Sequence, residues 1–283
     1  MISIVMILLV ARPVMANPYW FQVGVFMLGS GANGEQTVTG ASVRIRTHVP
    51  AAGVPQSQMR TATAFWVGLD FPNDAFIQVG YHCLEATGYP QWFWEYFPPK
   101  TASSGSGFSH GSTLEQEQQV GPDGSWHTYM LQSSGDIWYT FVDGVQVGSY
   151  NLETADSGGH IPYAFAEVTE VVTTNIVLGP SEFANFSYRD TNNVWHLVTE
   201  AFVWMGYGAG SGVLSSGTIF PYGLKVLGVN HWIAGSGFPL TDNYTIIWKG
   251  SQVATQSLST PVPNTSQPIL AVIPIRQSSK ELL

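Results

Sequence analysis

Charged side chains are scarce in this sequence. Asp, Glu, Lys and Arg make up 10% of its 283 residues, and the formal net charge is −9. About a quarter of the residues of an average globular protein are charged. The ten Lys and Arg residues are scattered along the chain, whereas a nucleic-acid-binding surface needs clustered positive charge. We therefore exclude nucleic acid as a partner.

Cysteine is almost absent as well. Cys83 is the only one, so the chain can form neither an internal disulfide nor a cysteine-based zinc site. The seven histidines never lie two, three or four residues apart, and the HExxH, CxxC and phosphate-loop motifs are missing. We expect no metal and no cofactor.

Long apolar runs are missing too, apart from a short one at the N-terminus. Residues 2–10 are apolar, which is too short to span a bilayer, and Val14 and Ala16 stand at −3 and −1 of a cleavage point before Asn17. We expect residues 1–16 to be a signal peptide and the protein to be secreted, with no membrane span after cleavage. A buried first strand is the alternative.

The residues that are abundant favour β-structure. The chain has 30 Gly, 17 Pro and 13% aromatic residues, and aromatic and β-branched residues are enriched in strands. Short alternating segments separated by turn residues predict an all-β sandwich. The expected strands are 19–28, 41–49, 62–70, 75–82, 91–97, 125–133, 136–142, 145–150, 163–172, 183–188, 194–204, 218–233 and 243–256.

The domain organisation is predicted from a break at residues 190–193, "DTNN". We expect residues 17–190 to form the sandwich. Residues 191–283 either add strands to it or form a small β appendage with a Pro-rich tail.

Polar residues interrupt two apolar strands in the stretch "FWVGLDFPNDAFIQVGYHC". Because side chains of a strand alternate between its faces, Trp66 and Asp70 share one face, and Gln78 lies on the corresponding face of the next strand. An unpaired buried amide costs about 1–3 kcal/mol. These faces predict the floor of a binding groove, and an ordinary solvent-exposed face is the alternative.

Two glutamates lie within later apolar strands. Glu95 is surrounded by rings in "QWFWEYFPP", where Trp94 falls on the opposite face, and burial there would raise the pKa of this carboxyl. Glu167 lies in "PYAFAEVTEVV", where a lone carboxylate is paired, exposed or functional.

In order and with similar gaps, "WVGLD", "IQVG", "WFWEYFP", "AEVTEV" and "FANFSY" resemble the strands of the glutamic peptidases, or eqolisins. The resemblance covers roughly residues 60–190. It implies a concanavalin-like sandwich of two bent antiparallel sheets that hydrolyses peptide bonds at acid pH. It assigns catalysis to Gln78 and Glu167, and we expect the substrate groove to be lined by Trp66, Asp70, Trp94 and Glu95.

The chemistry needs only these two residues. A carboxylate can take a proton from an attacking water and return it to the leaving amine. A side-chain amide can hold the developing oxyanion. Two departures from the family pattern are Val168, where a Trp is usual, and His82, where an acidic residue is usual.

A second resemblance involves "GSWHTYMLQSSGDIWYTFVDGVQVGS", which is similar to the hairpins of laminarinase-like and lectin-like sandwiches in the concanavalin superfamily. It implies a lectin-like module that binds a glycan or an extended peptide in an aromatic groove. A glycosidase using Glu95 and Glu167 and a purely structural protein are further alternatives. The expected partner is a polypeptide or a polysaccharide.

Overall fold

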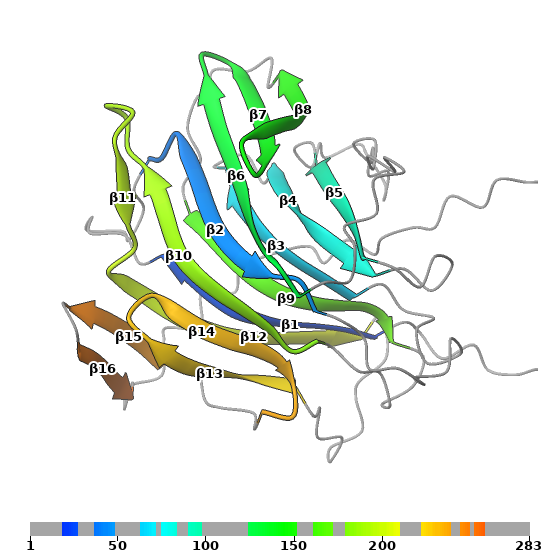
Figure 1. Cartoon of the computed structure of the whole chain (residues 1–283), viewed down its shortest axis with the longest axis vertical. Helices are drawn as coiled ribbons and strands as arrows, with labels where there is room; N and C mark the ends of the chain where they lie inside the picture. Colours follow the sequence, from blue (N-terminus) through cyan, green and yellow to red (C-terminus); the bar gives the residue numbers. More distant parts are fainter. Residues whose placement is uncertain are drawn as a thin grey trace, which may run out of the picture.

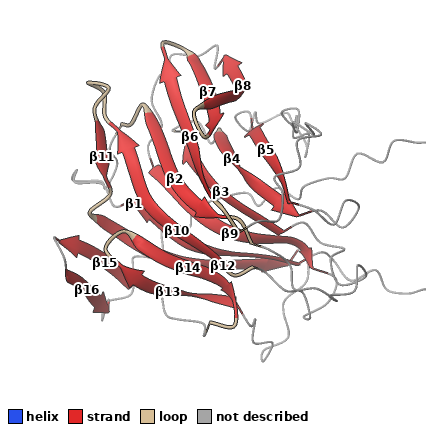
Figure 2. Ribbon diagram, in the orientation of Figure 1, coloured by secondary structure: helices blue, strands red, loops and turns tan. Residues whose placement is uncertain are grey.

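The computed structural model describes residues 19–27, 37–48, 63–71, 75–83, 90–97, 124–151, 161–171, 179–209, 222–238, 244–249 and 252–257. The regular structure in these ranges is entirely β-strand (Figure 2). The described residues therefore contain no helix that could cross a membrane. The expected signal peptide and most of the Pro-rich tail lie outside the described residues, so secretion remains a prediction.

The first sheet has eight antiparallel strands in the order β16-β15-β12-β1-β9-β3-β4-β5. Strands β9, β3, β4 and β5 carry the segments that contain Glu167, Trp66, Gln78 and Glu95. The bounds, in sheet order, are β16 Gln252–Ser257, β15 Tyr244–Lys249, β12 Glu200–Ala209, β1 Tyr19–Met27, β9 Ile161–Val171, β3 Thr63–Asp70, β4 Phe76–Cys83 and β5 Pro90–Phe97.

The second sheet is also antiparallel, with the order β13-β14-β10-β2-β6-β7-β8, and a short strand β11 pairs with β10. Figure 1 shows its long, curved strands stacked on those of the first sheet. The prediction of an all-β sandwich of two antiparallel sheets is confirmed. The bounds are β13 Tyr222–Gly228, β14 His231–Ser236, β10 Ser181–Arg189, β2 Gly40–Arg46, β6 Trp126–Ser134, β7 Ile137–Val142, β8 Val145–Asn151 and β11 Trp195–Leu197.

The main core fills the space between the sheets. Every second residue of each central strand enters it, for example Val67 of β3, Val79 of β4 and Ala166 of β9 from the first sheet. Tyr129 and Trp138 enter it from the second sheet and are fully buried. This alternation turns the residues between them outward, onto the opposite face of their own sheet.

Three segments expected to be single strands are each divided into two. The segment 194–204 becomes β11 and β12, which belong to different sheets, while 218–233 becomes β13 and β14 and 243–256 becomes β15 and β16. The β13–β14 turn contains Asn230, whose φ is +46°. Asn adopts this conformation more readily than most residues. The chain can therefore turn between the two strands without a Gly or Pro inside the turn, and the sequence looks like one uninterrupted apolar strand.

Strands that follow residue 190 take part in both sheets. In the first sheet β12 pairs with β1 along its whole length, from Tyr19 opposite Ala209 to Met27 opposite Ala201. In the second sheet β14 pairs with β10.

Candidate functional site

Five polar or indole-bearing side chains gather on the outer face of the first sheet, the face turned away from the second sheet. In the strand register, Ala64 pairs with Glu167 and Gly68 pairs with Gln78. Directly paired residues point to the same side of a sheet, so both polar side chains share the face of Trp66, which lies between those rows. We call Gln22, Trp66, Gln78, Glu95 and Glu167 the outer-face cluster.

Glu167 lies at one side of the cluster and is 5% exposed. The indole Nε1 of Trp66 donates a hydrogen bond of 2.9 Å to its Oε2, and Gln22 lies opposite it in the register of β1 and β9. Burial raises the pKa of the Glu167 carboxyl to about 7, against hydrogen bonds from Gln22 and Trp66 that lower it, and the charge of Glu95 raises it further.

Glu95 and Gln78 form the other side of the cluster. They pair across β4 and β5, and the Gln78 Nε2 donates a hydrogen bond of 2.7 Å to the Glu95 Oε2. Burial raises the pKa of Glu95 to about 7, which the bond from Gln78 partly offsets. This direction agrees with the one expected for a glutamate buried among these rings.

The outer-face cluster is surrounded by apolar side chains. Trp66, Phe76, Phe93, Tyr163 and Phe165 form a second buried apolar group, separate from the core between the sheets. The partly exposed rings of Phe26 and Trp204 pack against it. This surrounding explains the raised pKa values, since a low-dielectric environment disfavours the charged form of a carboxyl.

Two buried amide oxygens in the cluster have no hydrogen-bond partner among the described residues. They are the Oε1 atoms of Gln22 and Gln78. A buried amide acceptor without a partner is costly and calls for an explanation.

Asp70 lies on the same face as Trp66, two rows beyond it. It is half-buried and accepts a hydrogen bond of 3.2 Å from the hydroxyl of Tyr163. Three of the residues expected to line the groove, Trp66, Asp70 and Glu95, thus share one face with Gln78 and Glu167.

Trp94 does not share that face, so its expected place in the groove is wrong. It lies in the core between the sheets, where a Cβ on Gly148 of β8 would come 2.4 Å from its Cε2. The reason is strand alternation, because Trp94 and Glu95 are consecutive and must point to opposite faces.

His82 of β4 pairs directly with Ala64 of β3. Its ring stacks on Phe93 at 5.0 Å between centroids, and burial lowers its pKa to about 4. It is therefore neutral at neutral pH, so it does not supply the acidic group that glutamic peptidases usually have nearby.

Gln22 was missed at the sequence level, although its strand carries the same pattern as that of Gln78. In "YWFQVGVFM" a single amide interrupts an apolar strand, and Val23 and Val25 enter the core. Strand alternation alone would have assigned Gln22 to the outer face. The local sequence does not show that β1 pairs with β9, so it does not predict that Gln22 lies beside Glu167.

Metal-ligating side chains do not gather in the described part of the chain. Within it, no group of three or more His, Cys, Asp or Glu residues lies close enough to hold an ion.

No protein-family model and no curated protein sequence matches the chain. Solved structures with a similar arrangement include porphyranase B from Zobellia galactanivorans, at 10% identity and a TM-score of 0.30 over 52% of this chain and 63% of that one. A laminarinase from Flavobacterium sp. UMI-01 is 13% identical, with a TM-score of 0.33 over 53% and 66%.

A family 16 endo-glucanase from Bacteroides ovatus is 11% identical, with a TM-score of 0.36 over 66% of this chain and 79% of that one. The chain thus spans less than two thirds of the first two enzymes. No activity is transferred to it from these similarities.

Proposed function

We propose that this protein is a hydrolase that cleaves peptide bonds on the outer face of its first sheet, with Glu167 as general acid/base and Gln78 as oxyanion donor. One observation carries the proposal: a buried glutamate with a pKa of about 7 shares a face with an amide that a second carboxylate holds in place. The resemblance to glutamic peptidases adds to this observation.

The proposed reaction uses the Glu167 carboxylate and the Gln78 amide, which is already hydrogen-bonded to Glu95. Glu167 takes a proton from water as the water oxygen attacks the carbonyl carbon, and it then gives the proton to the leaving amine. A side-chain amide has two N–H donors. Glu95 accepts one from Gln78, which leaves the second for the developing oxyanion, an interaction of about 3–4 kcal/mol in other hydrolases.

The register favours Gln78 over Glu95 as the partner of Glu167. Gln78 is on β4, two strands from β9, whereas Glu95 is on β5, three strands away. Both are offset from Glu167 by the same four residues along the strands. In this proposal the scissile carbonyl lies over Trp66, between Gln78 and Glu167, and Glu95 positions Gln78.

The pKa of Glu167 changes the pH range that the resemblance implies. A general base must be ionised, and a carboxyl with a pKa of about 7 is mostly protonated below pH 6. We therefore propose activity that rises through pH 7 instead of one that peaks in acid.

Glycan binding or hydrolysis is the second candidate. Two coupled carboxyls with pKa values of about 7 would suit an acid and a base, and the rings of Phe26 and Trp204 remain partly exposed beside them. The porphyran and laminarin named with the similar enzymes supply suitable test polysaccharides.

The test compares the wild type with Glu167→Gln and Gln78→Ala on an unfolded polypeptide and on the two polysaccharides, from pH 4 to 9. We expect peptide cleavage that Glu167→Gln abolishes and Gln78→Ala lowers about 100- to 1,000-fold. Peptide cleavage that survives Glu167→Gln contradicts the assignment. Polysaccharide binding or cleavage without peptide cleavage favours the second candidate.

A further inference from the structure

A polar cavity lies at one end of the second sheet, well away from the outer-face cluster. Its volume is about 550 Å³, within the range of about 300–1,000 Å³ that small-molecule sites occupy. The turn between β6 and β7 and the turn between β10 and β11 meet the start of β2 at this end (Figure 1). The lining includes Thr39, Gln132, Ser133, Arg189, Thr191 and Asn193.

A row of directly paired residues crosses the sheet beside the cavity. Gly40 pairs with both Gln132 and Arg189, and Arg189 pairs with Trp195. Their side chains therefore point to the same face of the sheet. The indole of Trp195 reaches across Arg189, because its Cη2 lies 3.1 Å from where a Cβ on Gly40 would be. Trp195 is not one of the lining residues, but it is 37% exposed and lies beside the lining residue Arg189, so an aromatic surface adjoins the cavity.

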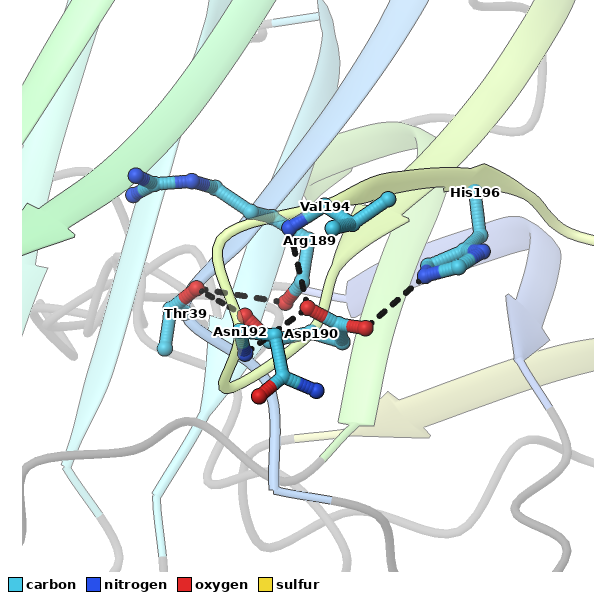
Figure 3. Close-up of polar contacts among 6 residues, drawn as sticks. All are labelled: Thr39, Arg189, Asp190, Asn192, Val194 and His196. Atoms are coloured by element: carbon cyan, nitrogen blue, oxygen red, sulfur yellow. Dashed lines mark hydrogen bonds and ion pairs between the residues drawn. The ribbon is translucent and has the colours of Figure 1, made fainter.

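The turn that carries Thr191 and Asn193 is held in place by Asp190. One carboxylate oxygen accepts hydrogen bonds from the main-chain N–H of Asn192 at 2.8 Å and of Val194 at 2.9 Å. The other contacts the Nε2 of His196 at 2.9 Å. Figure 3 shows these contacts, with the Arg189 side chain extending away from His196. The edge of the cavity is thus ordered before any ligand arrives.

Several polar groups at the cavity are available to a ligand. Arg189 uses its Nη1 for the carbonyl of Ser133 at 3.0 Å, which fixes the guanidinium and leaves its other donors. Across the described residues, the side chains of Gln132, Thr191 and Asn193 make no hydrogen bond that would have to be broken. Amides and hydroxyls both donate and accept hydrogen bonds, as sugar hydroxyls do.

We propose that this cavity is a second binding site, for a neutral oligosaccharide, in which Trp195 packs against a sugar ring and Gln132, Arg189 and Asn193 bind its hydroxyls. The described lining contains no carboxylate, which disfavours a cation. Its single guanidinium already binds a carbonyl, and a chain with a net charge of −9 repels polyanions.

The test uses calorimetric titration of the full chain with neutral glucose, mannose and galactose oligosaccharides and with sulfated galactan oligosaccharides. We expect Trp195→Ala and Gln132→Ala each to weaken binding of a neutral oligosaccharide about ten-fold or more. Leu197→Ala is the matched control, because Leu197 is on the same short strand and is 56% exposed, but it pairs with Ser187, which is not a lining residue, whereas Trp195 pairs with Arg189, which is. It should bind like the wild type.

Glu167→Gln separates this site from the proposed hydrolytic site, and we expect it to leave oligosaccharide binding here unchanged. The proposal is wrong if no neutral oligosaccharide binds, or if Trp195→Ala binds as tightly as Leu197→Ala. Binding restricted to the sulfated oligosaccharides also overturns it.

Discussion

At the scale of single residues, Trp66 links the apolar and the polar parts of the outer-face cluster. It is 1% exposed, it packs edge-on against Phe76 at 5.4 Å between ring centroids, and it donates to Glu167. Its N–H stabilises the ionised form of that carboxyl, so it lowers the pKa of Glu167 against the effect of burial.

Trp66→Phe keeps an aromatic ring and removes the N–H. We expect the pKa of Glu167 to rise further and the ascending limb of the pH–rate profile to move to higher pH. A hydrogen bond to a charged group contributes about 1.5–3 kcal/mol, so activity at pH 6 should fall roughly ten-fold.

The matched control for that measurement is Trp204→Phe, which changes a partly buried ring of the same apolar group without removing a donor to Glu167. Equal shifts of the pH profile in both variants would show that packing, and not the hydrogen bond, sets the pKa.

Glu167 also links stability to pH. Its folded-state pKa of about 7 lies above the ordinary value of 4.5, so the folded state holds the proton more tightly. Its contribution to the free energy of unfolding is complete below pH 4.5 and is lost as the pH rises to 7.

Glu167→Gln removes this titration. The difference in free energy of unfolding between variant and wild type should shift in favour of the variant, on the order of 3 kcal/mol, when the pH is raised from 4 to 8. Urea unfolding at both pH values measures the difference, with the exposed Glu200→Gln as control. If the difference in free energy of unfolding between variant and wild type is the same at pH 4 and at pH 8, then Glu167 does not have a raised pKa in the folded state.

At the scale of strands, Asn230 in the β13–β14 turn holds together backbone segments from other strands. This residue is 4% exposed, and its side chain accepts from the N–H of Phe186 at 2.6 Å. Its Nδ2 donates to the carbonyls of Phe186 at 2.7 Å and Val198 at 3.0 Å. It thereby pairs backbone groups where β10 bulges and where the chain leaves β11 for β12.

Asn230→Ala should leave the N–H of Phe186 and the carbonyl of Val198 without partners, while the carbonyl of Phe186 keeps the N–H of Val198 at 2.9 Å. Each unpaired buried group costs about 1–3 kcal/mol, so we expect a loss of at least about 2 kcal/mol in the free energy of unfolding. Asn193→Ala is the comparison, since Asn193 has φ of +65° but is exposed, and should cost only about 1 kcal/mol. Similar losses in both would mean that backbone strain alone matters at Asn230.

At the scale of the whole molecule, the strands after residue 190 are built into the sandwich. β12 covers one edge of β1, and Val203, Trp232 and Trp248 contribute fully or almost fully buried side chains to the core between the sheets. Without them, β1 and β10 would present open edges.

A chain that ends after residue 190 should therefore not unfold cooperatively. It would expose apolar surface worth about 1.5–3 kcal/mol for each large core side chain, against a total stability of about 5–15 kcal/mol. Circular dichroism and thermal unfolding beside the full chain test this. A sharp, two-state transition in the shortened chain would show that residues 17–190 are an independent domain.

The β-rich architecture and the face that most polar residues occupy follow from local sequence patterns. Alternation has a period of two wherever a strand forms, so Gln78, Glu95 and Glu167 could be assigned to faces before their partners were known. The same alternation sets Trp94 opposite Glu95, which excludes Trp94 from the groove residues expected beside the resemblance.

Which strands are neighbours follows from the packing of the whole chain and from no local pattern, because pairing depends on contacts between segments far apart in the sequence. Glu167 meets Gln22 and Trp66 because β9 lies between β1 and β3. Gln132, Arg189 and Trp195 meet because β6, β2, β10 and β11 are adjacent. Neither arrangement leaves a local pattern, since the packing of both sheets around one core selects the strand order.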